Sequence, residues 1–128
     1  MASSAEQPVV WAIRFTDRAS DDIQAAEDYL VETAGDDIAK AWSRGLIVEV
    51  AKLARFPTIW PAAEEDKLFK QSVRRMLHRR TKRGPACRVL FVLRQSPDDA
   101  PTVGTIHVRH SARAPVTQQE AWKIEASE

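Results

Sequence analysis

The 128-residue chain contains only one cysteine, Cys87, one tyrosine, and no long apolar run. A single cysteine cannot form an internal disulfide. The lack of a disulfide is common in proteins of a reducing compartment. No stretch approaches the roughly 20 apolar residues that cross a bilayer. Residues 1–8 also lack the basic start and apolar run of a secretory signal. We therefore expect a cytoplasmic protein that does not enter a membrane.

Patterns that bind metals or phosphates are also missing. The three histidines and the cysteine are scattered, without the ligand spacing of a zinc site. Gly45, Gly84 and Gly104 form no glycine-rich phosphate loop. We expect no metal and no cofactor. The length fits a single domain, residues 1–128, with a flexible N-terminus over residues 1–8.

Charge is distributed unevenly along the chain, although the formal net charge is only +1. Residues 67–94 contain ten Lys and Arg residues and no Asp or Glu. Residues 1–66 hold six basic and thirteen acidic side chains, a balance of −7, whereas residues 67–128 hold thirteen basic and five acidic ones, a balance of +8. A cationic surface of this kind attracts polyanions, either phosphate backbones or acidic protein segments.

Apolar periodicity predicts a strand and two helices in the first half of the chain. Residues 9–15 form a short run rich in β-forming residues, which indicates a strand. Thr16 suits a helix N-cap, and Gly35 suits the left-handed position at which a helix ends. A second helix is expected to begin at Asp36 or Asp37, antiparallel to the first. Its apolar residues recur every three or four positions: Ile38, Ala41, Trp42, Leu46, Val50 and Leu53.

The basic half is expected to form strands. Residues 73–80 and 87–93 indicate two strands joined by a turn over residues 81–85, and residues 103–108 a third strand after a turn over residues 96–101. Thr117 and Glu120 have capping-box spacing, which predicts a C-terminal helix over residues 118–126 within the tail 117–128. The order favours an α+β fold in which a helical hairpin packs on one face of a mainly antiparallel sheet of about four strands.

Alternation along the central strand divides its side chains between the two faces of the sheet. One face receives Val89, Phe91 and Leu93, and the other, expected to be partly open, receives Arg88, Leu90, Val92 and Arg94. Most of the basic block is typical of a solvated strand edge. Arg88 is the stronger functional candidate, because it aligns with the apolar core strand.

A second basic group, Arg109, His110 and Arg113, follows the last predicted strand. In an antiparallel meander this group can converge with Arg88, because the last strand ends beside the start of the strand that carries Arg88. Guanidinium groups suit phosphate and carboxylate, since the planar fork bonds two oxygens at once. His110 is the best placed proton-transfer candidate near neutral pH.

The order of these elements resembles the RelE/ParE superfamily of toxins from bacterial type II toxin–antitoxin modules, which includes plasmid stabilisation proteins. The segments that carry the resemblance are FTDRASDDIQAAEDYL, VRRMLHRR, CRVLFVL and IHVRHSARAP. Its most specific pieces are Arg88 directly before the central apolar strand and the Arg-His-x-x-Arg element that ends at Arg113. The resemblance implies a small cytoplasmic toxin that inhibits growth and is neutralised by a cognate antitoxin protein.

The resemblance leaves two activities open. RelE-like members are ribosome-dependent endoribonucleases that cleave mRNA, and this activity would make Arg88, His110 and Arg113 catalytic. ParE-like members bind and inhibit DNA gyrase without bond-breaking chemistry. For that activity the target-binding residues would be Arg75, Arg79, Arg88, Arg109 and Arg113.

We favour the ParE-like activity. RelE-like nucleases usually place a tyrosine near the C-terminus, whereas the only tyrosine here, Tyr29, lies on the first predicted helix. Whether the protein is an enzyme depends on this choice. A third possibility is a nucleic-acid-binding module without toxicity, which predicts steeply salt-dependent binding and no growth arrest. Trp122 on the C-terminal helix either packs on the domain or marks a surface for a partner.

Overall fold

In a computed structural model of the chain, residues 9–82, 86–110 and 113–128 are described. The predicted flexible N-terminus and residues 83–85 of the predicted turn lie outside the described residues. The elements follow in the order β1 (Ala12–Phe15), α1 (Asp17–Ala34), α2 (Asp36–Ala51), β2 (Arg74–Arg79), β3 (Ala86–Ser96), β4 (Asp99–His110) and α3 (Gln118–Ala126). Three short 3₁₀ turns, at Lys52–Ala54, Pro57–Ile59 and Asp66–Leu68, lie between α2 and β2. The predicted order of strands and helices is confirmed.

The sheet has four strands in the order β1-β4-β3-β2. β1 is parallel to β4, and the other neighbours are antiparallel, as expected for a mainly antiparallel sheet. β3 and β4 are longer than predicted, because Ser96 pairs with Asp99 and the Ser96 hydroxyl accepts a hydrogen bond of 3.2 Å from the Asp99 N–H. The turn between them is correspondingly shorter than residues 96–101.

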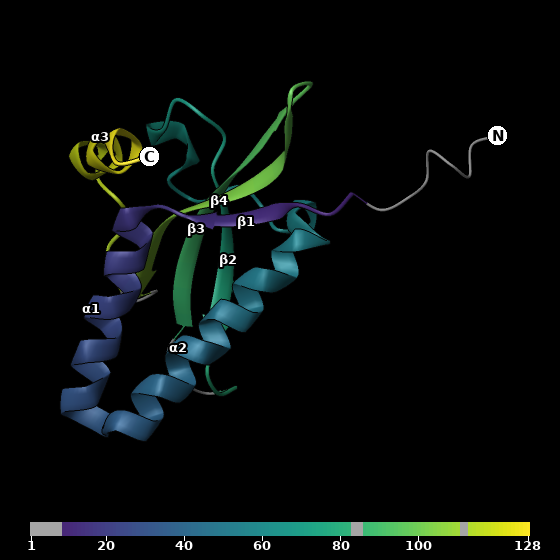
Figure 1. Cartoon of the computed structure of the whole chain (residues 1–128). Helices are drawn as coiled ribbons and strands as arrows, with labels where there is room; N and C mark the ends of the chain where they lie inside the picture. Colours follow the sequence, from purple (N-terminus) through teal and green to yellow (C-terminus); the bar gives the residue numbers. More distant parts are fainter. Residues whose placement is uncertain (1–8, 83–85, 111–112) are drawn as a thin grey trace.

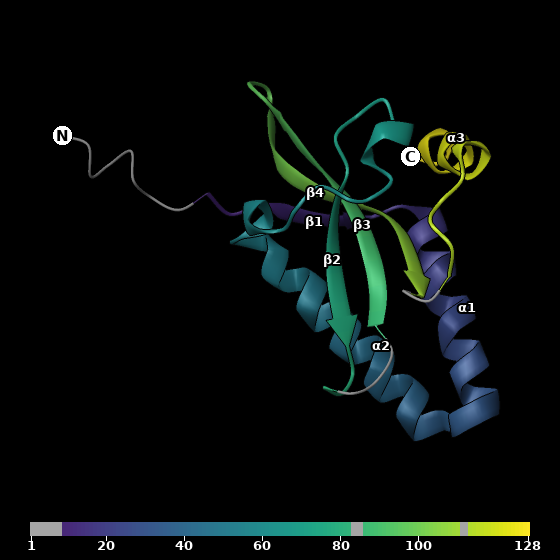
Figure 2. The ribbon, with the colours of Figure 1, turned by 180° about the vertical axis from the view of Figure 1, so that it is seen from behind.

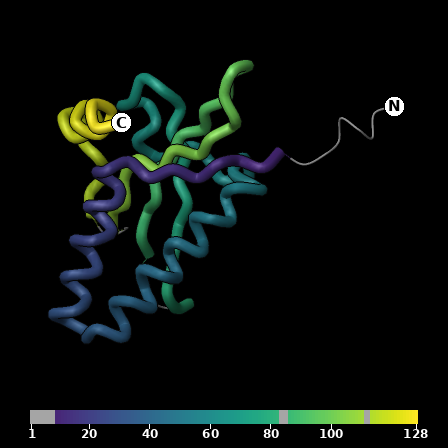
Figure 3. The backbone as a smooth tube through the Cα atoms, in the orientation of Figure 1, coloured from purple at the N-terminus to yellow at the C-terminus, as the bar shows by residue number. Residues whose placement is uncertain are grey.

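The two long helices begin and end as the sequence predicts. The Thr16 hydroxyl accepts a hydrogen bond of 3.1 Å from Ala19 N and so caps α1. Gly35 has a φ of 96°, and its N–H donates to Leu30 O and Val31 O. α1 and α2 meet at this glycine and diverge towards the sheet, so the hairpin has the shape of a V (Figures 1 and 3).

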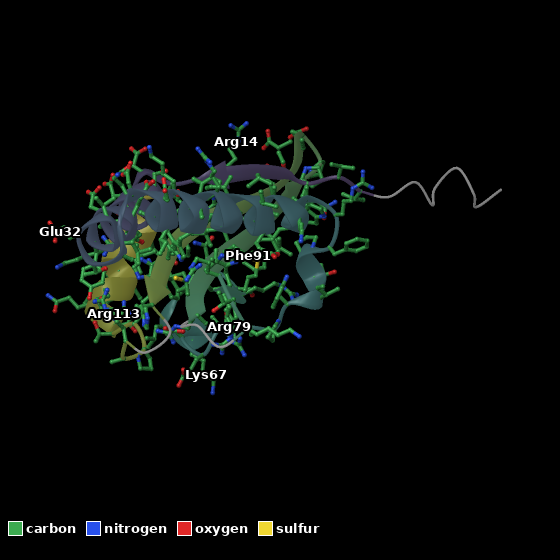
Figure 4. All side chains as sticks on the ribbon, turned by 90° about the horizontal axis from the view of Figure 1, so that it is seen from below. Arg14, Glu32, Lys67, Arg79, Phe91 and Arg113 are labelled. Atoms are coloured by element: carbon green, nitrogen blue, oxygen red, sulfur yellow. The ribbon has the colours of Figure 1, made fainter. Side chains whose placement is uncertain are left out.

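The core divides between the two faces of the sheet, as alternation along β3 predicts. Val89 and Phe91 pack against Trp42, Leu46 and Val50 of α2, and Figure 4 shows Phe91 in the interior. Leu90 and Val92 belong to a second cluster, which includes residues of β4, of the segment before β2 and of the C-terminal region: Ile106, Ala63, Phe69, Val73, Val116, Ala121 and Ile124. The second face is therefore more covered than we expected.

α3 and residues 62–73 make this cover. Figure 2 shows α3 beside the connection between α2 and β2, while β2 and β3 run in front of α2. Ala63 N donates to Val73 O, and Arg75 N donates to Pro61 O, so residues 61–63 extend the outer edge of β2 at its start. The cover matters because Arg88 lies beneath it.

A β-bulge in β4 changes the alternation of side chains. Leu90 pairs with His107, but Phe91 pairs with Thr105, so Ile106 is the extra residue. Ile106 and His107 are consecutive and both buried. The bulge was not predicted.

Candidate functional site

Arg88 and Arg109 lie directly opposite each other on β3 and β4. The structure thus brings together one arginine from each of the two predicted basic groups. Both are buried, with 8% and 4% of their side-chain surface exposed. Two adjacent buried guanidinium groups require nearby anions or acceptors, because an unpaired buried charge is costly.

Carboxylates from the connection before β2 surround Arg88. Its Nη2 lies 3.3 Å from Glu65 Oε2, and its Nη1 lies 3.7 Å from Glu64 Oε2. Nη2 also donates to Ala114 O at 3.4 Å. Glu65 is itself buried, and its Oε2 accepts a hydrogen bond of 3.0 Å from Val116 N. Arg88 therefore joins β3 to the cover instead of facing solvent, which corrects our expectation that it lines an open face.

Arg109 is held by the C-terminal helix. Its Nη1 donates to Glu120 Oε2 at 3.0 Å, its Nη2 donates to Glu120 Oε1 at 3.3 Å, and its Nε donates to Ala114 O at 2.9 Å. This is the two-pronged geometry in which a guanidinium recognises a carboxylate. The hydrogen bonds from Arg109 and from the Thr117 backbone lower the pKa of Glu120 to about 2.

A chain of polar contacts extends from Arg109 to α1. Arg109 Nη1 lies 3.4 Å from His107 Nε2, and His107 Nδ1 lies 2.6 Å from Asp22 Oδ2. Asp22, His107, Arg109 and Glu120 thus connect α1, β4 and α3. The sequence did not single out Asp22, Glu65 or Glu120 as partners of the basic residues. The acidic run that includes Glu64 and Glu65, just before the basic block, was the available signal.

Arg75 lies near Arg88 on the same face of the sheet. A cleft of about 470 Å³ is lined by Ala62, Glu64, Arg75, Leu77 and Arg88. Arg75 is half-buried there, and Arg79 is exposed at the end of β2. The cleft holds two of the predicted target-binding arginines beside one carboxylate, so its floor is less cationic than the sequence suggested.

His110 and Arg113 lie elsewhere, in a larger groove between the helical hairpin and the ends of β3 and β4. This groove, which we call the hairpin groove, has a volume of about 610 Å³. Much of its lining is apolar: Ala25, Ala26, Leu30, Ala34, Ile38, Trp42, Cys87 and Val108. Arg80, His110 and Arg113 also line it and are exposed. Figure 4 shows Arg79 and Arg113 on the side of the molecule away from Arg14.

Cys87 closes one wall of the hairpin groove as a buried core residue. Burial raises the pKa of its thiol, and a hydrogen bond with Trp42 offsets part of that rise. A thiol in this state is a poor nucleophile. Among the described residues, no group of three or more His, Cys, Asp or Glu side chains is arranged to hold a metal ion. The apolar lining together with Arg80 and Arg113 suits the groove to an amphipathic surface.

Comparisons with known proteins agree with this architecture. No protein-family model and no curated protein matches the chain. Among solved structures, a chain of the chromosomal ParDE TA system from P. aeruginosa is similar, with a TM-score of 0.59 and 16% sequence identity. The match covers 79% of this chain and 96% of that chain. This similarity establishes the fold: the protein has the RelE/ParE-like α+β fold that its sequence predicted.

In the part of the chain that the structure describes, no helix is both long enough and apolar enough to span a membrane.

Proposed function

We propose that the protein is the toxin of a type II toxin–antitoxin system, that it inhibits growth by binding DNA gyrase in the manner of ParE, and that a cognate antitoxin neutralises it. The similarity to a ParDE chain over 96% of that chain's length carries the proposal. The uneven charge supports it, because a cationic half of a small domain is suited to acidic partners.

The separation of the candidate catalytic residues favours the gyrase-binding alternative over the nuclease. Arg88 contacts Glu64 and Glu65 on one face of the sheet, whereas His110 and Arg113 line the hairpin groove. The RelE-like alternative needs Arg88, its phosphate-stabilising candidate, and His110, its proton-transfer candidate, around one reacting phosphate. Tyr29 lines the groove as well, on α1 instead of near the C-terminus. This arrangement supports binding without bond cleavage.

Induced expression without a partner tests the proposal. We expect growth arrest, inhibition of supercoiling by purified gyrase, and intact mRNA in a ribosome-dependent cleavage assay. Arg79→Ala and Arg113→Ala remove exposed cations and should weaken gyrase inhibition, while Arg14→Ala, an exposed cation of β1 on another side of the molecule, should not. Ribosome-dependent cleavage would instead support the RelE-like nuclease. Salt-dependent nucleic-acid binding without growth arrest would support the non-toxic binding module.

We further propose that the antitoxin inserts an amphipathic segment into the hairpin groove. The apolar lining offers area to bury, and Arg80 and Arg113 offer charges that complement carboxylates along the edge of that segment. Tyr29 and Ile38 line the groove, and both are among the exposed large apolar side chains. An acidic or amphipathic product of the adjacent reading frame is the expected partner.

Substitutions on exposed groove residues test this docking site without disturbing the core. Ile38→Asp should weaken antitoxin binding by about tenfold or more, because it places a carboxylate against an apolar surface. The matched control is Ile59→Asp, since Ile59 is more exposed, at 72%, and does not line the groove. Calorimetric titration with the purified antitoxin gives the two affinities. Equal losses in both variants would rule out the groove as the docking site.

A further inference from the structure

The C-terminal segment already binds Arg88 and Arg109, two of the arginines that we predict to contact a target. Glu120 binds Arg109 through two oxygens, and Ala114 O accepts hydrogen bonds from both Arg109 and Arg88. Glu65, the other partner of Arg88, also accepts a hydrogen bond from Val116 N. Residues 114–116 and Glu120 therefore contact both arginines or their direct partners.

Glu120 has a second role at the start of α3. Its Oε1 accepts hydrogen bonds from Thr117 N at 3.1 Å and from the Thr117 hydroxyl at 3.3 Å, while the Thr117 hydroxyl accepts one from Glu120 N at 3.2 Å. These bonds form the capping box of α3. The same oxygen, Oε1, accepts from Arg109 Nη2. One carboxylate oxygen thus takes part in both the ion pair and the helix cap.

Three apolar side chains fix this segment to the second core cluster. α3 has nine residues, and only Ala121 and Ile124 are buried, with Val116 buried just before the helix. Trp122 is 62% exposed. The remaining ties are polar and exposed: Glu125 accepts from Lys70 N, Gln118 donates to Leu68 O, and Glu128 contacts Arg94 and Gln71. Exposed polar contacts of this kind contribute little individually, so Val116, Ala121, Ile124 and the Glu120 ion pair carry most of the attachment of this segment.

We propose that residues 114–128 form a displaceable strap that keeps the toxin surface masked. In this arrangement the Glu120 carboxylate is an internal substitute for a carboxylate of the protein target, and Arg88 and Arg109 bind the target only after α3 has left the sheet. The inference rests on the proposed function for its activity measurement. Its physical basis is Glu120 Oε1, which accepts hydrogen bonds from both Arg109 and Thr117 N and so links the ion pair to the helix cap.

Glu120→Gln tests the strap. The amide retains a capping-box acceptor but loses the charge that pairs with Arg109. We expect hydrogen exchange over residues 114–126, and modification of Arg88 and Arg109 by phenylglyoxal, to accelerate by about tenfold. Peptide mass spectrometry of the full chain measures both. Glu32→Gln, which makes the same charge change at an exposed position of α1, should leave both rates unchanged.

Thr117→Ala is a second variant, since it removes the cap hydroxyl and leaves both charges in place. It should also accelerate exchange of α3 and modification of the two arginines. If neither variant changes these rates, the segment is a fixed part of the domain and the strap is wrong, whatever the activity of the protein.

Inhibition of gyrase then tests whether the strap masks the toxin surface. Gyrase inhibition should be stronger in Glu120→Gln than in the wild type and unchanged in Glu32→Gln. If the strap opens but inhibition falls or stays the same, α3 does not mask the toxin surface. If no variant inhibits gyrase or growth, the proposed function fails, while opening of the strap is still decided by exchange and modification.

Discussion

The Asp22 carboxylate on α1 accepts a hydrogen bond of 3.0 Å from the backbone N–H of Val108 on β4. β1 pairs with β4 only over Thr102–Thr105, so the later residues of β4 form a sheet edge on that side. A buried edge donor needs an acceptor. Asp22 supplies it, and Thr16 N, which donates to Thr105 O, and the Thr16 hydroxyl, which donates to Ile106 O, continue the same connection.

Asp22→Ala is therefore expected to destabilise the domain. It leaves Val108 N without its acceptor and removes the carboxylate beside His107, for a loss of about 1–3 kcal/mol in the free energy of unfolding. Urea denaturation measures the loss. Asp21→Ala, an exposed neighbour on the same helix, is the control and should change stability by less than about 0.5 kcal/mol. Equal effects of the two variants would contradict the role of Asp22 as the acceptor for Val108 N.

The lowered pKa of His78 should make the stability of the protein depend on pH. It is buried on β2, and burial lowers its pKa below 6.5, although Glu49 offsets part of this shift. Because the unfolded chain binds the proton more readily, the folded state should lose stability as the pH falls below 6.5, until the pH reaches the pKa of the folded state. Well above 6.5 the histidine is neutral in both states and adds no pH dependence.

His78→Leu should remove this component. Comparing the free energy of unfolding of the two proteins from pH 8 to pH 5 isolates His78, because the other titrating groups are common to both. We expect the difference between the variant and the wild type to shift in favour of the variant below pH 6.5. A difference that stays constant across this range would show that burial does not shift the pKa of His78.

Alanine substitutions at two glycines should change stability in opposite directions. At Gly45, on α2, an added Cβ would lie 3.7 Å from the nearest His78 ring atoms, which is an ordinary contact. Gly45→Ala should therefore stabilise the protein by about 0.5–1 kcal/mol, because alanine favours the helix. At Gly104, on β4, the added Cβ would lie only 3.2 Å from Val92 Cγ2. Gly104→Ala should destabilise, and thermal unfolding of the two variants compares them directly.

The local elements were predictable because their signals lie within a few residues. Thr16 and Gly35 bound α1, and Thr117 with Glu120 begins α3, as the sequence indicated. The bulge at Ile106 was not predictable, because it depends on the register between β3 and β4.

The partners of the arginines depend on longer-range contacts. Glu65 reaches Arg88 only because the connection before β2 folds back over the sheet, and Glu120 reaches Arg109 only because α3 docks on the same face. A count of charges along the chain identifies a basic block, but it does not show which cations the fold neutralises. For the same reason, the role of Arg88 and Arg109 in binding a target stays a prediction.

The pair of Arg88 and Glu65 determines how that prediction must be tested. Both side chains are buried, with exposed fractions of 8% and 1%. Removing one partner of a buried pair leaves an uncompensated charge, so Arg88→Ala should cost about 3–5 kcal/mol in the free energy of unfolding. Glu64, whose side chain is 68% exposed, contacts the same arginine at 3.7 Å, and Glu64→Gln should cost less than about 1 kcal/mol.

The double variant Arg88→Met with Glu65→Leu removes both charges and retains apolar volume. It should recover most of the stability that Arg88→Ala loses, because replacing a buried pair by packed apolar residues is often neutral. Only a folded protein without Arg88 can report on target binding, so growth inhibition should be measured in the double variant and not in Arg88→Ala. Retained toxicity in the folded double variant would remove Arg88 from the target-binding surface. Lost toxicity, together with intact folding by circular dichroism, would assign Arg88 to it.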